Sequence, residues 1–200
     1  MKEIVSLMDY RSSIKVVDAT LRDGGLVNDF YFTDEFVRAL YESNVKAGVD
    51  YMEMGYKASK EMFDQSKFGK WKFCDDDEIR EIVGDNDTNL KIAVMADVGR
   101  CDYKKDILSR SESPIDLIRV ATYLNTIPAA ANMIEDAKKK GYEVTCNIMA
   151  ISNGQESDLR VALDILGQTS ADVLYIVDSF GSLYPEQIAR ITDTYMEFAA

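Results

Sequence analysis

The sequence predicts an α/β fold with a parallel sheet, and three observations support this prediction. Six short apolar runs rich in β-branched residues recur along the 200 residues. Several of them are apolar almost throughout, which is typical of parallel strands covered by helices. Amphipathic stretches with helix start and stop signals fill the intervals, and strand–helix repeats of this kind form right-handed βαβ units. The runs begin at Ile14, Val49, Leu90, Ile115, Glu143 and Asp172.

Capping signals mark the expected helices. Thr33 precedes a stretch whose apolar residues recur at helical spacing, and Gly48 ends it. The run Asp75–Asp77 has two interpretations, a metal cluster or a helix N-terminus, and the helix dipole favours the second. The same kinds of signal predict helices over residues 128–140 and 156–167 and from residue 185 onward.

Composition excludes several classes of function. The chain has 23 basic and 35 acidic residues, so its net charge of −12 argues against nucleic acid or an anionic membrane surface as a partner. It has no histidine, which excludes histidine-based nucleophiles and imidazole metal sites built from these residues. No apolar run is long enough to span a membrane, and no secretory signal pattern opens the chain. We therefore expect a cytoplasmic protein, with Cys74, Cys101 and Cys146 as reduced thiols.

Polar residues gather where the predicted strands end. A closed barrel brings all such ends to one mouth, whereas an open doubly wound sheet would spread them along an edge. The pattern therefore predicts a TIM (β/α)8 barrel, as one domain over residues 1–200. The polar strand-end residues are Asp18, Thr20, Glu53, Asp97, Arg119, Asn147, Asp178 and Ser179.

Only six βα units can be counted, so we expect the barrel to be incomplete here, without strands seven and eight. The sequence stops inside a helical pattern, which indicates the N-terminal part of a longer protein. Unpaired edges at strands one and six would favour association. A homo-oligomer through these edges, or through the N-terminal segment, is the expected assembly.

The most informative stretch runs from Val16 to Phe30, where the first strand ends and delivers Arg22 and Asp23 to the mouth. A carboxylate is a hard ligand for a divalent cation, and a guanidinium can bind a carboxylate or an enolate oxygen. Gly24-Gly25 is expected to turn the backbone tightly beneath a ligand. Taken alone, the Arg-Asp pair could equally be a structural ion pair in a loop.

The sequence Asp-Ala-Thr-Leu-Arg-Asp-Gly-Gly (residues 18–25) resembles the signature of the metal-dependent aldolase and lyase family. This pyruvate carboxyltransferase-like family includes 3-hydroxy-3-methylglutaryl-CoA lyase, 4-hydroxy-2-oxovalerate aldolase and the isopropylmalate synthases. Three later segments are also similar to the family, so that the resemblance runs from about Ile14 onward. They are Glu53-Met54-Gly55, Ile118-Arg119-Val120 and Asp178-Ser179-Phe180-Gly181.

The resemblance implies a barrel with Mn²⁺ or Mg²⁺ bound at Asp23 and with Arg22 stabilising an enolate. The substrate would be a small 2-oxo or hydroxy acid, cleaved or formed at the bond next to its carbonyl. Physical chemistry agrees with these roles, because a metal can hold the carboxylate and carbonyl of a 2-oxo acid while an arginine faces the oxygen on which negative charge develops. Glu53 and Asp178 are candidates to support the metal or its ligands. The expected substrate contacts are Arg22, Thr20, Gly24, Arg119, Asn147 and Ser179.

The chain departs from the family pattern in two ways. It lacks the histidine pair that completes the metal site, and Leu26 follows Gly25 where the aldolases place a histidine base. We therefore expect the 200-residue chain alone to be inactive. One alternative is a barrel fragment that binds a small acid or phosphate at Arg22 and Arg119 without chemistry. A flavodoxin-like nucleotide-binding sheet is disfavoured, because the Gly-Gly sequence lacks the spacing of a phosphate-binding loop.

Overall fold

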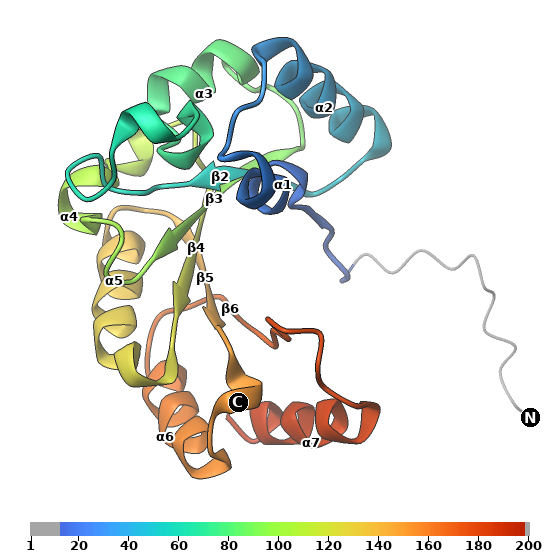
Figure 1. Ribbon diagram of the computed structural model, residues 1–200, viewed down its shortest axis with the longest axis vertical. Helices are drawn as coiled ribbons and strands as arrows, with labels where there is room; N and C mark the ends of the chain where they lie inside the picture. The colour runs from blue at the N-terminus through green and yellow to red at the C-terminus, as the bar shows by residue number, and fades with distance from the viewer. Residues whose placement is uncertain (1–12, 199–200) are drawn as a thin grey trace, which may run out of the picture.

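The computed structural model describes residues 13–198, which form one six-stranded sheet. All neighbouring strands are parallel and lie side by side in chain order. The sheet curls, and all helices after the first follow one another round its outer side (Figure 1). The predicted incomplete TIM barrel is therefore confirmed as a half-barrel of six βα units. The strands are β1 (Val17–Asp18), β2 (Tyr51–Tyr56), β3 (Lys91–Asp97), β4 (Leu117–Thr122), β5 (Glu143–Ile148) and β6 (Val173–Tyr175).

The helices begin and end close to their sequence signals. The Thr33 side chain accepts a hydrogen bond from the Phe36 amide at 3.3 Å, and Gly48 ends the same helix in the left-handed conformation. Asp75–Asp77 begins a helix, which confirms that interpretation of the acidic run. The helices are α1 (Thr20–Asn28), α2 (Asp34–Ala47), α3 (Asp76–Val83), α4 (Tyr103–Asp106), α5 (Ile127–Lys139), α6 (Glu156–Gly167) and α7 (Pro185–Met196). Short 3₁₀ turns, η1 to η5, lie at Gln65–Lys67, Lys70–Lys72, Arg110–Glu112, Leu124–Thr126 and Ile151–Asn153.

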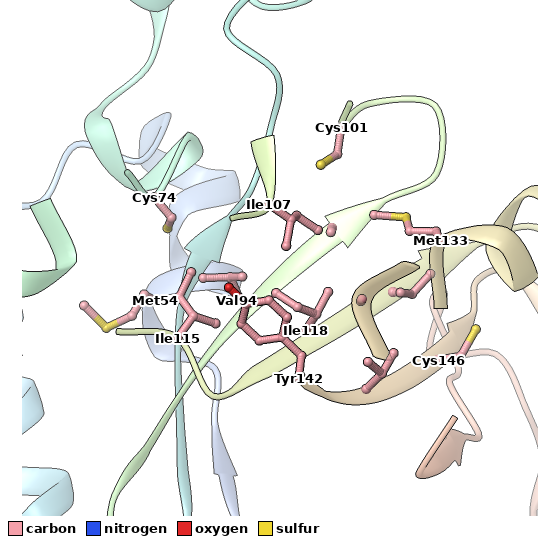
Figure 2. Close-up of a cluster of buried hydrophobic side chains, with 14 of the residues drawn as sticks. Met54, Cys74, Val94, Cys101, Ile107, Ile115, Ile118, Met133, Tyr142 and Cys146 are labelled. Carbon is pink, nitrogen blue, oxygen red and sulfur yellow. The ribbon is translucent and has the colours of Figure 1, made fainter. Parts of the chain in front are cut away.

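The main core lies between the outer face of the sheet and the helices. Val94 and Ile118, from neighbouring strands, are fully buried against Met133 of α5 (Figure 2). Three free cysteines are buried in or beside this core. This large apolar interface fixes the strand positions, so that side chains on the inner face are held by a rigid support.

The inner face of the sheet has a different character. Along β4, Leu117 and Arg119 point inward, alternating with core residues such as Ile118, because side chains of a strand alternate between its faces. Near the start of the strands, Leu117 packs with Tyr51 and Ala93 in a small separate apolar cluster. Two residues further along, the same face carries charge. The barrel interior therefore changes from apolar at its base to polar towards its mouth.

Two details of the sequence interpretation are wrong. Gly24-Gly25 lies inside helix α1 and makes no tight turn. Glycine is needed at residue 25 for close packing, because a Cβ there would approach the Phe30 ring to 2.1 Å. Strand β6 ends at Tyr175, so Asp178 and Ser179 lie in the loop beyond it.

Candidate functional site

Three buried charges from three different elements meet inside the half-barrel. Glu53, on β2, is completely buried. Its Oε2 atom accepts hydrogen bonds from Arg22 Nε of α1 at 2.9 Å and from Arg119 Nη1 of β4 at 2.5 Å. Two guanidinium groups and one carboxylate sum to a charge of +1, which the exposed Asp23 balances through its ion pair with Arg22 at the solvent side. The buried trio of Arg22, Glu53 and Arg119 would therefore suit a small anion that takes the place of Asp23 on Arg22.

The trio leaves hydrogen-bonding capacity unused. Glu53 Oε1 and Arg119 Nε are buried without a partner, as are Thr145 Oγ1 and Asn147 Oδ1 on the neighbouring strand β5. Buried polar atoms normally have partners, since leaving one unpaired costs about 1–3 kcal/mol. Their concentration on the inner face of adjacent strands indicates a surface made to contact a polar ligand or water. Arg119 is further held by the Tyr175 ring of β6, whose centroid lies 4.9 Å from its Cζ atom.

Arg22 and Asp23, although adjacent, have different environments. The Arg22 side chain is 16% exposed and points to Glu53, whereas the Asp23 side chain is 62% exposed. The two still form an ion pair with each other. Burial alone would lower the pKa of Arg22, but the charge of Glu53 and its hydrogen bond raise it overall. Arg22 is therefore a permanent cation at the mouth, and Asp23 lies at its solvent side.

The turn before α1 is fixed by Asp18. Its Oδ1 accepts hydrogen bonds from the Thr20 amide and from the Thr20 hydroxyl, at 3.2 and 2.5 Å. Its Oδ2 accepts one from Asn44 of α2 at 2.8 Å. Asp18 therefore orients the start of α1, and with it Arg22, while the Thr20 hydroxyl is already engaged within this turn.

The other predicted contact residues are spread over the mouth. Asn147 is buried on the inner face of β5, the strand next to Arg119 on β4, whereas Ser179 is exposed. The Ser179 hydroxyl oxygen accepts a hydrogen bond from the Ala150 amide at 2.9 Å, which ties the loops after β5 and β6 together. Gly24 packs against the Phe32 ring, at 3.4 Å from where a Cβ would lie. The structure thus brings Arg22, Glu53, Arg119 and Asn147 onto one buried surface and leaves the others around it.

A second polar group lies at the ends of β2 and β3. Burial raises the pKa of Asp97, and the cations Arg100, Lys72 and Arg22 offset part of that effect. Burial, reinforced by the charge of Asp97, raises the pKa of Tyr56, while Arg22 acts in the opposite direction. These mutual effects show that Asp97 and Tyr56 belong to the same charged surroundings as Arg22.

Asp97→Asn is expected to raise the free energy of unfolding at neutral pH. A carboxyl whose pKa is raised on folding resists ionisation in the folded chain, so its charge destabilises the fold once the pH exceeds the folded pKa. Below the ordinary aspartate pKa of about 4, both states are protonated and the gain should vanish. Urea denaturation between about pH 4 and 8 measures this dependence.

Asp50→Asn is the matched control. Hydrogen bonds from the Val16 amide and from Lys15 lower the pKa of Asp50. Its substitution should therefore reduce stability at neutral pH, with the loss fading in acid as the wild-type carboxylate protonates. Equal pH profiles for the two variants would contradict the assigned environment of Asp97.

The metal implied by the resemblance lacks a complete set of ligands in residues 13–198. Divalent cations such as Mg²⁺ take about six oxygen ligands, several of which can be water. Asp23 offers one exposed carboxylate, already paired with Arg22. Among the described residues, no group of three or more Asp, Glu or Cys side chains is arranged to hold a metal ion. The residues present do not by themselves fit a structured metal centre.

Sequence reasoning missed two residues near the trio. Tyr175 follows Val173 on the inward-facing side of β6, where it pairs with Asn147, and strand periodicity could have indicated it. Lys72 lies between Trp71 and Phe73 in the loop after β2, where no sequence pattern pointed to it. The structure buries it among aromatic rings.

Fold and site together define a class of protein: a (β/α) half-barrel with a buried arginine–glutamate–arginine cluster at the end where the strands terminate. No helix among residues 13–198 has the length and apolarity to cross a membrane. No protein-family model matches the chain. Relatives and a solved structure narrow the class further.

The chain is 25% identical to a 4-hydroxy-2-oxovalerate aldolase from Geobacillus genomosp. 3 over 182 residues, which cover 89% of this chain and 52% of the relative. It is 27% identical to 4-hydroxy-2-oxovalerate aldolase 3 from Rhodococcus jostii, over 88% of this chain and 51% of that one. The chain thus spans about half the length of these curated relatives. These relatives are named as aldolases, in agreement with the resemblance of the opening motif.

A solved structure agrees on the fold. The N-terminal domain of a proposed aldolase from Bacteroides vulgatus superposes with a TM-score of 0.76 at 23% identity. The match covers 92% of this chain and 60% of that one. The half-barrel therefore recurs in an aldolase-related N-terminal domain.

Proposed function

We propose that the buried trio binds a small 2-oxo acid and that the protein is a carbon–carbon lyase of the 4-hydroxy-2-oxovalerate aldolase type. The observation that supports this most is the pair of arginines sharing the single Glu53 oxygen. Two guanidinium groups thus face one buried carboxylate, and Arg119 Nε is a buried donor without a partner. A 2-oxo acid carries the carboxylate and the carbonyl oxygen that such donors recognise.

In this reaction, the bond between the α and β carbons of the carbonyl breaks and its electron pair moves towards the carbonyl oxygen. The hydroxyl on the β carbon loses its proton, and that carbon leaves as an aldehyde. Arg22, held by Glu53, would donate to that oxygen as charge develops. Arg119 would hold the carboxylate, and Tyr175 would keep the Arg119 guanidinium in place. The unpartnered Asn147 Oδ1, beside them, would accept a hydrogen bond from the substrate hydroxyl.

The experiment is an assay for pyruvate release from 4-hydroxy-2-oxovalerate, with and without Mn²⁺ or Mg²⁺. We expect the complete protein to release pyruvate and the 200-residue chain to be inactive while still binding pyruvate. Calorimetry on the chain measures that binding. The proposal fails if the chain shows no affinity for pyruvate and the complete protein releases none.

Asp23 is proposed as one ligand of a divalent metal whose remaining ligands lie outside the described residues. One exposed carboxylate gives little affinity on its own, so calorimetry with Mn²⁺ should show only weak binding to the 200-residue chain. In the complete protein, Asp23→Asn should weaken Mn²⁺ binding, and Asp64→Asn, an exposed loop substitution, should leave it unchanged. Full metal affinity in the Asp23→Asn protein would contradict the proposal.

A second candidate function, binding of a small acid or phosphate without chemistry, is favoured by the incomplete ligand set among residues 13–198. It predicts anion binding to the complete protein that no added metal changes and no pyruvate release. We further propose a cytoplasmic location, which three unpaired cysteines favour. Self-association through the β1 and β6 edges is proposed because each of these strands pairs on one side only within the described residues.

A further inference from the structure

Cleavage of a 4-hydroxy-2-oxo acid needs a group that accepts and returns a proton. The hydroxyl on the β carbon must lose its hydrogen for that carbon to leave as an aldehyde, and the α carbon must then gain one to become the methyl group of pyruvate. Histidine is the commonest residue in such steps, but the chain has none. Carboxylates are the next most common, so the acidic side chains of the mouth are the candidates.

Most acidic side chains of the mouth are already engaged. Glu53 is held by two arginines, Asp18 fixes the turn before α1, and Asp23 forms an ion pair at the solvent side. Asp97 differs from them. It is 7% exposed, yet its Oδ1 atom is buried without a partner among residues 13–198. Its Oδ2 atom lies 3.6 Å from the Arg100 guanidinium, whose side chain is 56% exposed, so Asp97 keeps an oxygen free for a ligand.

Asp97, the last residue of β3, faces the interior of the half-barrel. Side chains of a strand alternate between its faces, and Asp97 has the same parity as Ala93, which packs in the small inner cluster. The intervening residues Ile92, Val94 and Ala96 belong to the main core on the outer side. The Asp97 carboxyl therefore lies on the face that carries the buried trio.

The trio crosses the inner face of β3. This strand lies between β2, which carries Glu53, and β4, which carries Arg119, and these two side chains meet at 2.5 Å. Arg119 is in register with Met95, two residues before Asp97, and two strand residues span about 7 Å. A 2-oxo acid held by the arginines would therefore lie against the end of β3, with its hydroxyl, two carbons beyond the carbonyl, towards Asp97.

Asn147 lies on the other side of the same position. Asp97 is in register with Ala121 on β4, and Ala121 is in register with Asn147 on β5. The two polar side chains thus flank a small one, and each has a buried oxygen without a partner in the described part of the chain. A hydroxyl between them can rotate its single hydrogen, so that it donates to Asn147 while Asp97 is protonated and to Asp97 once that carboxyl is ionised.

The charges around Asp97 favour proton uptake. Burial raises the pKa of Asp97, and the charge of Glu53 on β2 adds to this effect. Three cations from the turn after β3, from η2 and from α1 offset part of it: Arg100, Lys72 and Arg22. Tyr56, at the end of β2, is a further titratable neighbour, because the charge of Asp97 raises its pKa. A carboxylate with a raised pKa is a stronger base than an ordinary aspartate and is better matched to neutral pH.

We propose that Asp97 is the catalytic base, which carries a proton from the hydroxyl of a bound 4-hydroxy-2-oxo acid to its α carbon. This inference rests on the proposed function. Asp97 Oδ1 takes the hydroxyl hydrogen, the O–H electron pair forms the aldehyde C=O bond, and the bond between the α and β carbons breaks. The electron pair of that bond forms the C=C bond of an enolate, whose oxygen faces Arg22. After the aldehyde leaves, Asp97 gives its proton to the α carbon, which yields pyruvate and restores the carboxylate.

The test is exchange of the pyruvate methyl protons for deuterium by the complete protein with Mg²⁺ in D₂O, followed by proton NMR. This exchange is the return of the proton run in reverse, so it needs the base but no aldehyde. Asp97→Asn should slow it about 10²–10⁴-fold, the usual contribution of general acid–base catalysis, while calorimetry still detects pyruvate binding. Asp64→Asn, the same change in an exposed loop, is the matched control and should exchange like the wild type.

Two further measurements separate a base from a structural residue. The wild-type exchange rate should rise with pH as Asp97 loses its proton, and Asp97→Asn should lose this rise. Asp97→Glu keeps a carboxyl and should therefore retain more exchange than Asp97→Asn. Because Asp97→Asn is expected to be at least as stable as the wild type at neutral pH, unfolding would not account for its loss of exchange.

The outcomes distinguish the two proposals. Exchange at the wild-type rate in Asp97→Asn would overturn the base and leave the proposed function standing. Pyruvate release by a wild-type protein that exchanges no methyl protons would do the same. Loss of pyruvate binding together with exchange would show that Asp97 acts in binding and not as the base. A wild-type protein that neither exchanges protons nor releases pyruvate would overturn both proposals.

Discussion

Replacing Glu53 with glutamine is expected to lower the free energy of unfolding by about 3–5 kcal/mol. Glu53 is completely buried and is the carboxylate that both Arg22 and Arg119 bind inside the half-barrel. Glutamine keeps the shape but removes the negative charge, so Arg119 would lose its ion-pair partner and would face Arg22, which keeps only the exposed Asp23. At the effective protein dielectric constant of about 20, such like-charge repulsion amounts to several kcal/mol at close contact.

Glu143→Gln is the control for this substitution. Glu143 also lies on the inner face, at the other end of the sheet, where it pairs with Lys91 at 2.8 Å. Its side chain is 30% exposed, and partly solvated pairs contribute about 1 kcal/mol or less. Urea denaturation of both variants gives the comparison. A Glu53→Gln protein as stable as Glu143→Gln would show that the trio is more hydrated than its burial indicates.

If a small anion binds at the trio, it should rescue part of this loss. A ligand that binds only the folded state stabilises it in proportion to the logarithm of its concentration over its dissociation constant. Pyruvate should therefore raise the unfolding midpoint of Glu53→Gln more than that of Glu143→Gln, because the uncompensated arginines gain a counter-ion. The same experiment thus measures the stability of the trio and its charge preference.

The fold was predictable because its signals are local. Apolar strands and capped helices repeat in order, and Thr33, Gly48 and the acidic start of α3 are found at the expected positions. Strand-end polarity predicted Glu53 and Arg119 at one mouth, and the stretch from Val16 to Phe30 predicted Arg22 there. Their mutual hydrogen bonds could not be predicted, since Glu53 and Arg119 are 66 residues apart and their contact depends on sheet curvature.

The misjudged details share a physical cause. A glycine pair is used both in tight turns and in close packing, and sequence alone does not separate these uses. At Gly25 the Phe30 ring, two residues beyond the end of α1, packs so closely against the helix that no side chain fits. Lys72 was missed for a similar reason, because the four rings around it come from three parts of the chain: the residues after α1, the end of β2 and the loop after β2. Such convergence is a property of the tertiary structure.

Arg22→Gln is expected to reduce kcat for pyruvate release by the complete protein about 10²–10³-fold, the usual effect of losing one preorganised oxyanion donor. The substrate carboxylate would still have Arg119, so KM should change much less. Arg160→Gln is the control, because Arg160 lies on α6 with a 40% exposed side chain paired with Glu156 and Glu197. It should leave kcat unchanged.

Binding of oxalate to the 200-residue chain gives a second measurement of the same role. Oxalate is planar and carries an additional negative oxygen where the enolate of pyruvate would develop its charge. A site complementary to the enolate should bind it more tightly than pyruvate. Arg22→Gln should then lose most of its affinity for oxalate but less of that for pyruvate. If both affinities fall equally, Arg22 serves ground-state binding, and stabilisation of the enolate must come from another residue.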